Sequence, residues 1–368
     1  MLRQYKLKNY NFILIFNVVA LSFIGYFAIG SAKESVQSRQ FYGIIVGLIL
    51  MILVSLINYS VYYYIRWIMY GLNIVFLILV LVAGHEVNGS KRWINIGFQF
   101  QPSELAKILL ILFFAQFIMK NKSNLNTFST ILASLLLLAA PLLLIYKEPD
   151  LSTTIMVCLS FAVMLFIGGL SYKIIFTILG ISIPAGIVFF SIILQDDGKI
   201  LEGYQITRIL AWLDPEKYAD SAAYQQINSV TAISSGQLVG KGLNNNAIAS
   251  VKNGNFISEP QTDFIYAIIG EELGFIGAAA VIILLILVVI ECLKIARYAK
   301  DDMGALICCG MAALISLQGF MNIAVATGFM PNTGIPLPFV SYGLTSLVSL
   351  YIGIGVVLNV GLQTTKTH

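Results

Sequence analysis

Ten long runs of apolar residues, separated by short polar stretches, make up most of the 368-residue chain. About 20 apolar residues in a helix cross a bilayer, and most of the runs approach or exceed this length. The runs lie at 11–30, 41–59, 66–84, 104–119, 128–146, 152–169, 173–194, 263–291, 303–327 and 341–362. The pattern therefore predicts an all-α, polytopic membrane protein with about ten transmembrane helices. Nine or eleven spans are alternatives, because the sixth run is short and only a tight turn at 147–150 separates it from the fifth.

Composition supports a membrane protein and argues against other classes. The chain is 58% hydrophobic and 11% charged, whereas soluble domains are about 45–50% apolar and about 25% charged. The net charge of +4 comes from small basic groups at the ends of apolar runs rather than from a basic stripe, so no nucleic-acid partner is expected. The four cysteines lack the spacing of a zinc or redox site, and no dedicated metal site is expected.

The distribution of lysine and arginine between short loops predicts the orientation in the membrane. Cytoplasmic loops carry an excess of these residues. One side of the predicted bundle collects Arg3, Lys6, Lys8, Arg66, Lys120, Lys122, Lys173, Lys294, Arg297, Lys300 and Lys366, and the other holds only Lys33, Arg39, Lys91, Arg92 and Lys147. Both termini of this multi-pass protein are therefore expected in the cytoplasm.

This orientation places a large extracellular loop, 195–262, between the seventh and eighth helices. The loop is rich in charged residues, Gly, Asn, Ser and Tyr. Ordered loops of this length are uncommon and tend to carry function. We find no second soluble domain, so residues 1–368 are expected to form a single transmembrane domain.

Asp263, where this loop meets the eighth apolar run, is the main candidate for catalysis. Pro260 ends the loop, and Thr262 is expected to cap a helix whose first turn contains Asp263. An acidic residue in a first turn can simply complement the helix dipole, contributing less than about 1 kcal/mol. A carboxylate at the hydrocarbon boundary is also partly desolvated, however, which raises its pKa and makes it a better base.

Four further charged residues lie within apolar runs. Glu271 and Glu272 occupy the eighth run two turns beyond Asp263, and Glu104 and Lys107 lie three residues apart after Pro102. Ionised groups inside a membrane are costly and are usually paired or functional. We expect Glu271 and Glu272 to bond to neighbouring helices, and Glu104 and Lys107 to pair on one helix face.

Candidate substrate contacts lie in three outer segments. The first is the basic and aromatic segment Lys91, Arg92 and Trp93. It could either anchor the protein at the membrane interface or bind an anionic lipid headgroup. The second is the long loop, with Arg208, Gln225, Ser229 and Lys241. The glycines around Lys241 do not form a Walker A pattern, but Arg208 and Lys241 are natural partners for a pyrophosphate.

The third segment, 331–343, contains three prolines in eight residues, including Pro336 and Pro338, and then Ser341. Prolines at this density prevent a regular helix. Irregular backbone at membrane depth is tolerated where it is buried in protein or lines a cavity. The segment is therefore a candidate wall for a substrate groove.

These clusters, in this order, resemble the SEDS family of bacterial membrane proteins, the group of FtsW, RodA and SpoVE. The likeness covers nearly the whole chain. The matching segments are Arg92-Trp93-Ile94; Gln101-Pro102-Ser103-Glu104 with Lys107; Pro149-Asp150-Leu151; Arg208 to Pro215; Tyr224-Gln225; Ala232-Ile233 with Ser235-Gly236 and Gly240-Lys241-Gly242; Thr262-Asp263-Phe264 with Glu271-Glu272-Leu273-Gly274; and Gly334-Ile335-Pro336-Leu337-Pro338-Phe339 with Ser341-Tyr342-Gly343. Among the departures, Glu148 stands where the family commonly has glutamine before Pro149.

The resemblance implies a peptidoglycan glycosyltransferase that polymerises lipid II on the outer face of the cytoplasmic membrane. The essential aspartate of the family falls on Asp263, and its membrane-embedded Glu–Lys pair falls on Glu104 and Lys107. The implied partners are a class B penicillin-binding protein and other membrane proteins of the division or elongation machinery. A divalent cation, Mg²⁺ or Mn²⁺, would be shared with the substrate pyrophosphate.

Two other functions fit a chain with charged residues inside its spans. One is a transporter or flippase of a lipid-linked precursor, in which these residues relay protons. Its coupling carboxylate would lie near the bilayer midplane, whereas Asp263 is predicted at the outer rim. The other is a non-catalytic scaffold of the division or elongation machinery, which would tolerate replacement of Asp263.

Overall fold

The structure, a computed structural model, describes residues 9–87, 90–95, 97, 99–195, 203–244 and 256–364. Most of these residues are helical. The helices are α1 (Phe12–Ala32), α2 (Glu34–Ser55), α3 (Val61–Ala83), α4 (Pro102–Lys120), α5 (Phe128–Lys147), α6 (Leu151–Ile167), α7 (Tyr172–Gln195), α8 (Gly203–Leu213), α9 (Tyr224–Ser235), α10 (Ile265–Arg297), α11 (Asp302–Ala326) and α12 (Leu344–Leu362), with a short 3-10 helix at Lys122–Asn124. Three strands, β1 (His85–Val87), β2 (Ser90–Asn95) and β3 (Gln99–Phe100), form a small antiparallel sheet in that order.

The helices confirm the predicted class of membrane protein. Eight of those within the described residues are long and apolar enough to cross a bilayer: α1 to α5 and α10 to α12. Two shorter apolar helical stretches are α6 and residues Tyr172–Val188 of α7. Each predicted apolar run coincides with one of these helices, while the count of ten spans stays a prediction.

The core of the bundle lies around α4, α11 and α12. Their apolar windows are 78%, 78% and 83% buried, compared with 22% for α3 and α5. Large apolar side chains are exposed around the outside of the bundle, for example Phe16 and Phe176, both 69% exposed. Contiguous exposed apolar surface of this kind is expected where a protein faces lipid.

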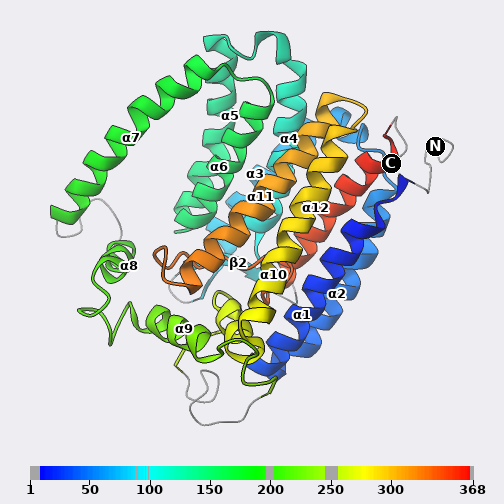
Figure 1. The fold of residues 1–368 in the computed structure, drawn as a ribbon. Helices are drawn as coiled ribbons and strands as arrows, with labels where there is room; N and C mark the ends of the chain where they lie inside the picture. The colour runs from blue at the N-terminus through cyan, green and yellow to red at the C-terminus, as the bar shows by residue number, and fades with distance from the viewer. Residues whose placement is uncertain are drawn as a thin grey trace.

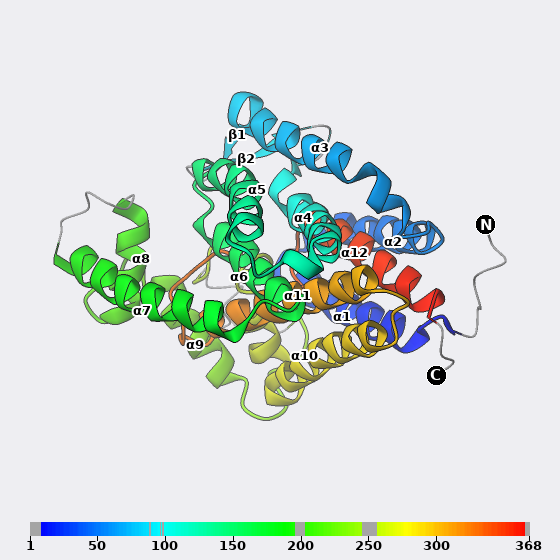
Figure 2. The same ribbon diagram turned by 90° about the horizontal axis from the view of Figure 1, so that it is seen from above.

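The two ends of the bundle differ in structure. The start of α1 and the end of α12 lie at one end, whereas β2, α8 and α9 lie at the other (Figure 1). The described residues 203–244 of the predicted large loop contain the two helices α8 and α9. Figure 2 shows that α7 diverges from the other helices, and its described side chains from Phe176 to Val188 are largely exposed.

The structure corrects the expected start of the eighth apolar helix. Its α10 begins at Ile265 with Phe264 as the N-cap, so Asp263 precedes the helix instead of lying in its first turn. Thr262 does not cap α10, because its hydroxyl donates to the Glu259 carbonyl oxygen at 2.8 Å and closes a preceding turn. The last helix likewise begins at Leu344, after a non-helical segment at 341–343.

Candidate active site

Asp263 lies in the turn that joins the predicted large loop to α10. The Asn322 side-chain amide on α11 donates to the carbonyl oxygens of Asp263 and Ile335, at 2.8 and 2.7 Å. A Cβ atom on Gly334 would lie 3.4 Å from Asp263 Oδ2, so the proline-rich segment passes close to the carboxylate. Asn322 thus fixes the Asp263 turn and the proline-rich segment to one helix.

The proline-rich segment is held by side chains from three directions. Ser341 donates to the Thr262 carbonyl oxygen at 2.6 Å and accepts from the Leu337 amide at 2.8 Å. Gln318 on α11 donates to the Pro336 carbonyl oxygen at 3.0 Å, and Ser152 on α6 donates to the carbonyl oxygen of Thr333 at 2.6 Å. These bonds replace those that a helix would make, which explains how an irregular backbone is accommodated here.

Two arginines from distant parts of the chain lie near Asp263. Arg92 on β2 donates through Nε to the Glu148 carbonyl oxygen at 3.2 Å and through Nη2 to that of Pro149. Arg208 on α8 donates to the carbonyl oxygen of Asn332 at 3.4 Å. The structure therefore brings Arg92 and Arg208 close enough to act electrostatically on Asp263, and we refer to the three residues as the Asp263 cluster.

The surroundings of Asp263 raise the pKa of its carboxyl above the ordinary value. Burial in protein is the largest cause; the positive charges of Arg208 and Arg92 oppose it, and the negative charges of Asp150 and Glu259 add to it. The residue is nevertheless half-buried rather than sealed. A carboxylate that is desolvated and still accessible can accept a proton from a hydroxyl group of a substrate.

Four other predicted substrate contacts differ in exposure and in their partners. Lys91 is exposed on β2, Trp93 is half-buried on the same strand, and Gln225 is half-buried on α9. Lys241 instead forms an ion pair with Glu271, with its Nζ 2.8 Å from Oε1. That pair lies two helical turns along α10 from Asp263, so the structure gives Lys241 a partner within the protein.

Two predicted substrate contacts have structural positions instead. Ser229 is fully buried and donates to the Ala326 carbonyl oxygen at 2.7 Å. Ser341 is 5% exposed and holds the proline-rich segment as described above. The sequence alone could not predict these partners, because it does not distinguish a serine whose hydroxyl bonds to the backbone from one whose hydroxyl bonds to a substrate. The neighbouring Gln226, which we did not predict, also anchors α9, donating to the carbonyl oxygens of Val325 and Met330.

The charged residues inside the spans contact one another or neighbouring elements. Glu104 and Lys107 are both 4% exposed and lie 2.8 Å apart between Oε1 and Nζ, so the expected pair on one helix face forms. Glu272 accepts a hydrogen bond from Ser31 at the end of α1. Pro336 is half-buried and Pro338 is buried, next to the Asp263 turn.

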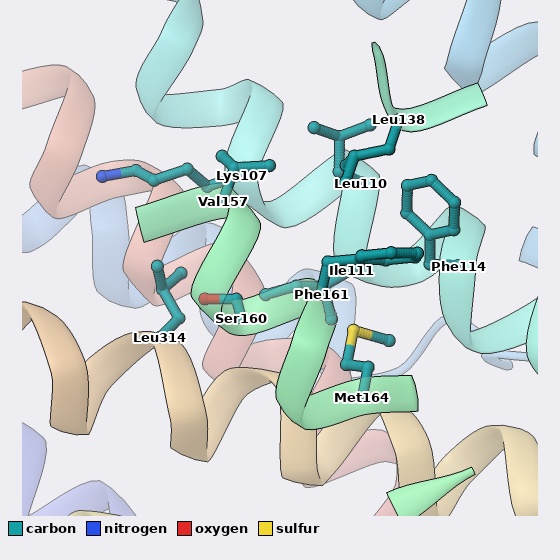
Figure 3. Close-up of a pocket in the computed structure, with 10 residues that line it drawn as sticks. All are labelled: Lys107, Leu110, Ile111, Phe114, Leu138, Val157, Ser160, Phe161, Met164 and Leu314. Atoms are coloured by element: carbon teal, nitrogen blue, oxygen red, sulfur yellow. The ribbon is translucent and has the colours of Figure 1, made fainter. Parts of the chain in front are cut away.

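A small cavity lies beside Lys107, between α4, α5, α6 and α11. Its free volume of about 10 Å³ is enough for roughly one water molecule. Figure 3 shows the ammonium group of Lys107 directed away from the rings of Phe114 and Phe161 that line the cavity. The cavity is therefore separate from the Asp263 cluster and too small for a lipid chain.

Two acidic residues near Arg92 were missed as candidates for the site. Asp150 Oδ1 lies 3.8 Å from Arg92 Nη1, and Glu148 is fully buried in the same turn. The signal available in the sequence was the Pro149-Asp150-Leu151 motif, which has no chemical meaning until Arg92 is placed beside it. Within the described residues, no group of three or more His, Cys, Asp or Glu side chains could hold a metal ion.

The fold and this cluster together define a polytopic membrane protein with ionisable groups gathered at one end of its helical bundle. Comparison with known proteins adds the family. The profile of the FtsW, RodA and SpoVE family, described as cell cycle proteins, matches residues 4–366. The chain belongs to this family.

Curated relatives match over most of their length. The chain is 34% identical over 376 residues to a probable peptidoglycan glycosyltransferase FtsW of Bacillus subtilis, covering 97% of this chain and 91% of that protein. It is also 34% identical over 325 residues to the peptidoglycan glycosyltransferase MrdB of Escherichia coli, covering 88% of this chain and 85% of the relative.

Solved structures share the fold. A chain from a peptidoglycan synthase complex, studied for the coordination of polymerization and crosslinking, superposes with a TM-score of 0.79 at 28% identity, covering 96% of this chain and 97% of that one. A variant of the rod shape determining protein RodA of Thermus thermophilus gives a TM-score of 0.70 at 25% identity, covering 97% and 99%.

Proposed function

We propose that this protein is a peptidoglycan glycosyltransferase that polymerises lipid II on the outer face of the bacterial cytoplasmic membrane. Relatives at 34% identity that span most of the chain carry this activity in their names. The observation that carries the proposal is Asp263, a half-buried carboxyl group with a raised pKa that lies within the electrostatic influence of two arginines.

In the proposed reaction Asp263 is the general base. It takes the proton from the C4 hydroxyl of the acceptor sugar, and that oxygen attacks the anomeric carbon of the donor. The new glycosidic bond forms as the bond to undecaprenyl pyrophosphate breaks, with inversion at the anomeric carbon. General-base catalysis of this kind contributes about 10²–10⁴-fold in rate.

The leaving pyrophosphate needs positive charge. Arg208 and Arg92 supply it next to Asp263, and Lys91 adds an exposed ammonium group on the same strand as Arg92. A divalent cation, Mg²⁺ or Mn²⁺, fits as a companion of the substrate pyrophosphate, since such ions bind through substrate phosphates plus one or two carboxylates.

The proposed setting follows from the charge bias of the short loops. It places both termini in the cytoplasm and α8, α9 and Asp263 outside. The proposed partner is a class B penicillin-binding protein that crosslinks the new strands, together with other membrane proteins of division or elongation. A solved relative that belongs to a peptidoglycan synthase complex supports such a partner.

Polymerisation of purified lipid II by the chain with its penicillin-binding partner tests the proposal. Asp263→Asn keeps the size of the side chain but removes the base, and we expect a loss of at least about 100-fold in glycan strand formation. The matched control is Asp220→Asn, which changes an exposed acid of the same outer segment and should leave the rate unchanged. Equal rates for Asp263→Asn and the native chain would contradict the assignment and favour a flippase or a scaffold.

A further inference from the structure

Asp150 is fixed at the start of α6 by two hydrogen bonds. Its Oδ1 accepts from the Thr153 backbone amide at 3.1 Å, and its Oδ2 accepts from the Thr153 hydroxyl at 2.9 Å. The residue is 3% exposed and is the N-cap of the helix. Its carboxylate therefore has one orientation, set by the first turn of α6.

The same short turn surrounds the guanidinium group of Arg92. Nε and Nη2 donate to the carbonyl oxygens of Glu148 and Pro149, and Nη1 lies 3.8 Å from Asp150 Oδ1. The side chains of Arg92 and Asp150 are only 19% and 4% exposed, so their charges interact more strongly than those of a surface pair. Three successive residues of one turn thus orient one arginine.

This turn is also joined to the Asp263 turn. Ser152, in the first turn of α6, donates to the Thr333 carbonyl oxygen at 2.6 Å. The next residue, Gly334, lies against the Asp263 carboxylate. The first turn of α6 and Asp263 therefore contact the same piece of the proline-rich segment, from two sides.

We propose that Asp150 is a positioning residue of the active site, which holds Arg92 so that its guanidinium group faces Asp263 and the reacting pyrophosphate. The proposal rests on the proposed function of Asp263. It explains why a charged cap is placed here: asparagine caps a helix about as well as aspartate, but it supplies no charge to orient Arg92.

The test compares Asp150→Asn in the native chain and in the Arg92→Ala background, measuring kcat/KM for lipid II polymerisation against pH. Asparagine keeps the cap, so thermal unfolding should change little. In the native background we expect a loss of roughly 10- to 100-fold, the cost of misplacing a group at an active site. In the Arg92→Ala background the further loss should be less than about 2-fold, because the two residues then act as one unit.

The pH profile adds a readout that separates the positioning role from a purely structural cap. Arg92 lowers the pKa of the Asp263 carboxyl by more than Asp150 raises it, so displacement of Arg92 outweighs the loss of the Asp150 charge. We therefore expect the acidic limb of the profile to move to higher pH in Asp150→Asn, whereas a variant that leaves Arg92 in place would move it to lower pH. The control is Asp301→Asn, which alters the N-cap of α11. There Asp301 Oδ1 accepts from the Gly304 amide at 2.8 Å. This variant should leave the acidic limb of the profile where it is in the native chain.

The proposal would be overturned by an equal cost of Asp150→Asn in both backgrounds, or by an acidic limb that does not move to higher pH. Its failure is distinguishable from failure of the proposed function. If Asp263→Asn polymerises lipid II at the native rate, the general-base assignment of Asp263 is wrong. If Asp263→Asn is inactive while Asp150→Asn has native activity, only the positioning role of Asp150 is wrong.

Discussion

Glu148 is a buried glutamate in the turn between α5 and α6. Its side chain is fully buried, and neither carboxyl oxygen has a hydrogen-bond partner within the described part of the chain. Burial, and then the charge of Asp150, raise the pKa of this carboxyl to about 9, against a smaller opposite effect of Arg92. At this pKa Glu148 is neutral at pH 7, and a neutral carboxylic acid closely matches glutamine in shape and lack of charge.

The raised pKa of Glu148 predicts how stability changes with pH. Between its ordinary pKa of 4.5 and about 9, the folded protein holds a proton that the unfolded chain releases, so rising pH favours unfolding. Stability of the native chain relative to Glu148→Gln should fall over this window by roughly 1 kcal/mol per pH unit and then level off.

Thermal unfolding in detergent at pH 5, 7 and 9 measures this difference. Glu148→Gln should unfold at a progressively higher temperature than the native chain as the pH rises. Glu216→Gln, which changes an exposed glutamate of the outer segment, serves as the control and should follow the native chain. A constant gap between Glu148→Gln and the native chain would mean that Glu148 is ionised throughout.

At the scale of elements, α10 is two helices joined by a break. Gly274 has φ 63° and ψ −163°, a conformation that essentially only glycine adopts. Two backbone amides of segment 237–242 donate to carbonyl oxygens before the break, and two amides after it donate to carbonyl oxygens of that segment, at 2.8 to 3.2 Å. Segment 237–242 therefore supplies the hydrogen bonds that the interrupted helix loses.

Replacement of this glycine should release the segment from α10. In Gly274→Ala the new Cβ would lie 2.3 Å from the Gly240 amide nitrogen, in a backbone conformation that costs alanine roughly 1–3 kcal/mol. We expect a fall of several degrees in the unfolding temperature in detergent. Gly71→Ala is the contrast: it lies inside α3 with nothing within 4 Å, and alanine should be neutral or slightly stabilising there. Equal unfolding temperatures for both variants would contradict the role of the break.

The elements differ in how well the sequence predicts them. The apolar runs predict the membrane helices because burial in lipid requires a long apolar stretch. The break at Gly274 leaves no such trace, since the run from 263 to 291 is apolar on both sides of it. The strands β1 to β3 and the helices α8 and α9 are short and half-polar, and contacts with the rest of the protein decide their conformation.

At the scale of the whole molecule, the candidate site depends on which distant segments of the chain the packing of the helices brings together. Asp263 could be chosen from the sequence because it lies at the boundary between a polar loop and an apolar run. Its partners could not be ranked in the same way: Arg92 reaches the cluster from β2 and Arg208 from α8, whereas Lys241 pairs with Glu271. Only the packing of the bundle distinguishes a basic residue that lies near Asp263 from one that forms an ion pair elsewhere in the protein.

The proposed orientation of the molecule is tested by labelling single cysteines in intact cells with a membrane-impermeant maleimide. The native cysteines give a low background, because Cys292, Cys308 and Cys309 are buried and Cys158 is half-buried.

Lys217→Cys places a thiol between α8 and α9, at the end of the bundle that holds Asp263, and Ser123→Cys places one between α4 and α5, at the opposite end (Figure 1). Both positions are exposed, so accessibility depends on the side of the membrane. We expect Lys217→Cys to react in intact cells and Ser123→Cys to react only after the membrane is permeabilised. The reverse pattern would place Asp263 in the cytoplasm, where a base for polymerisation outside the cell could not act.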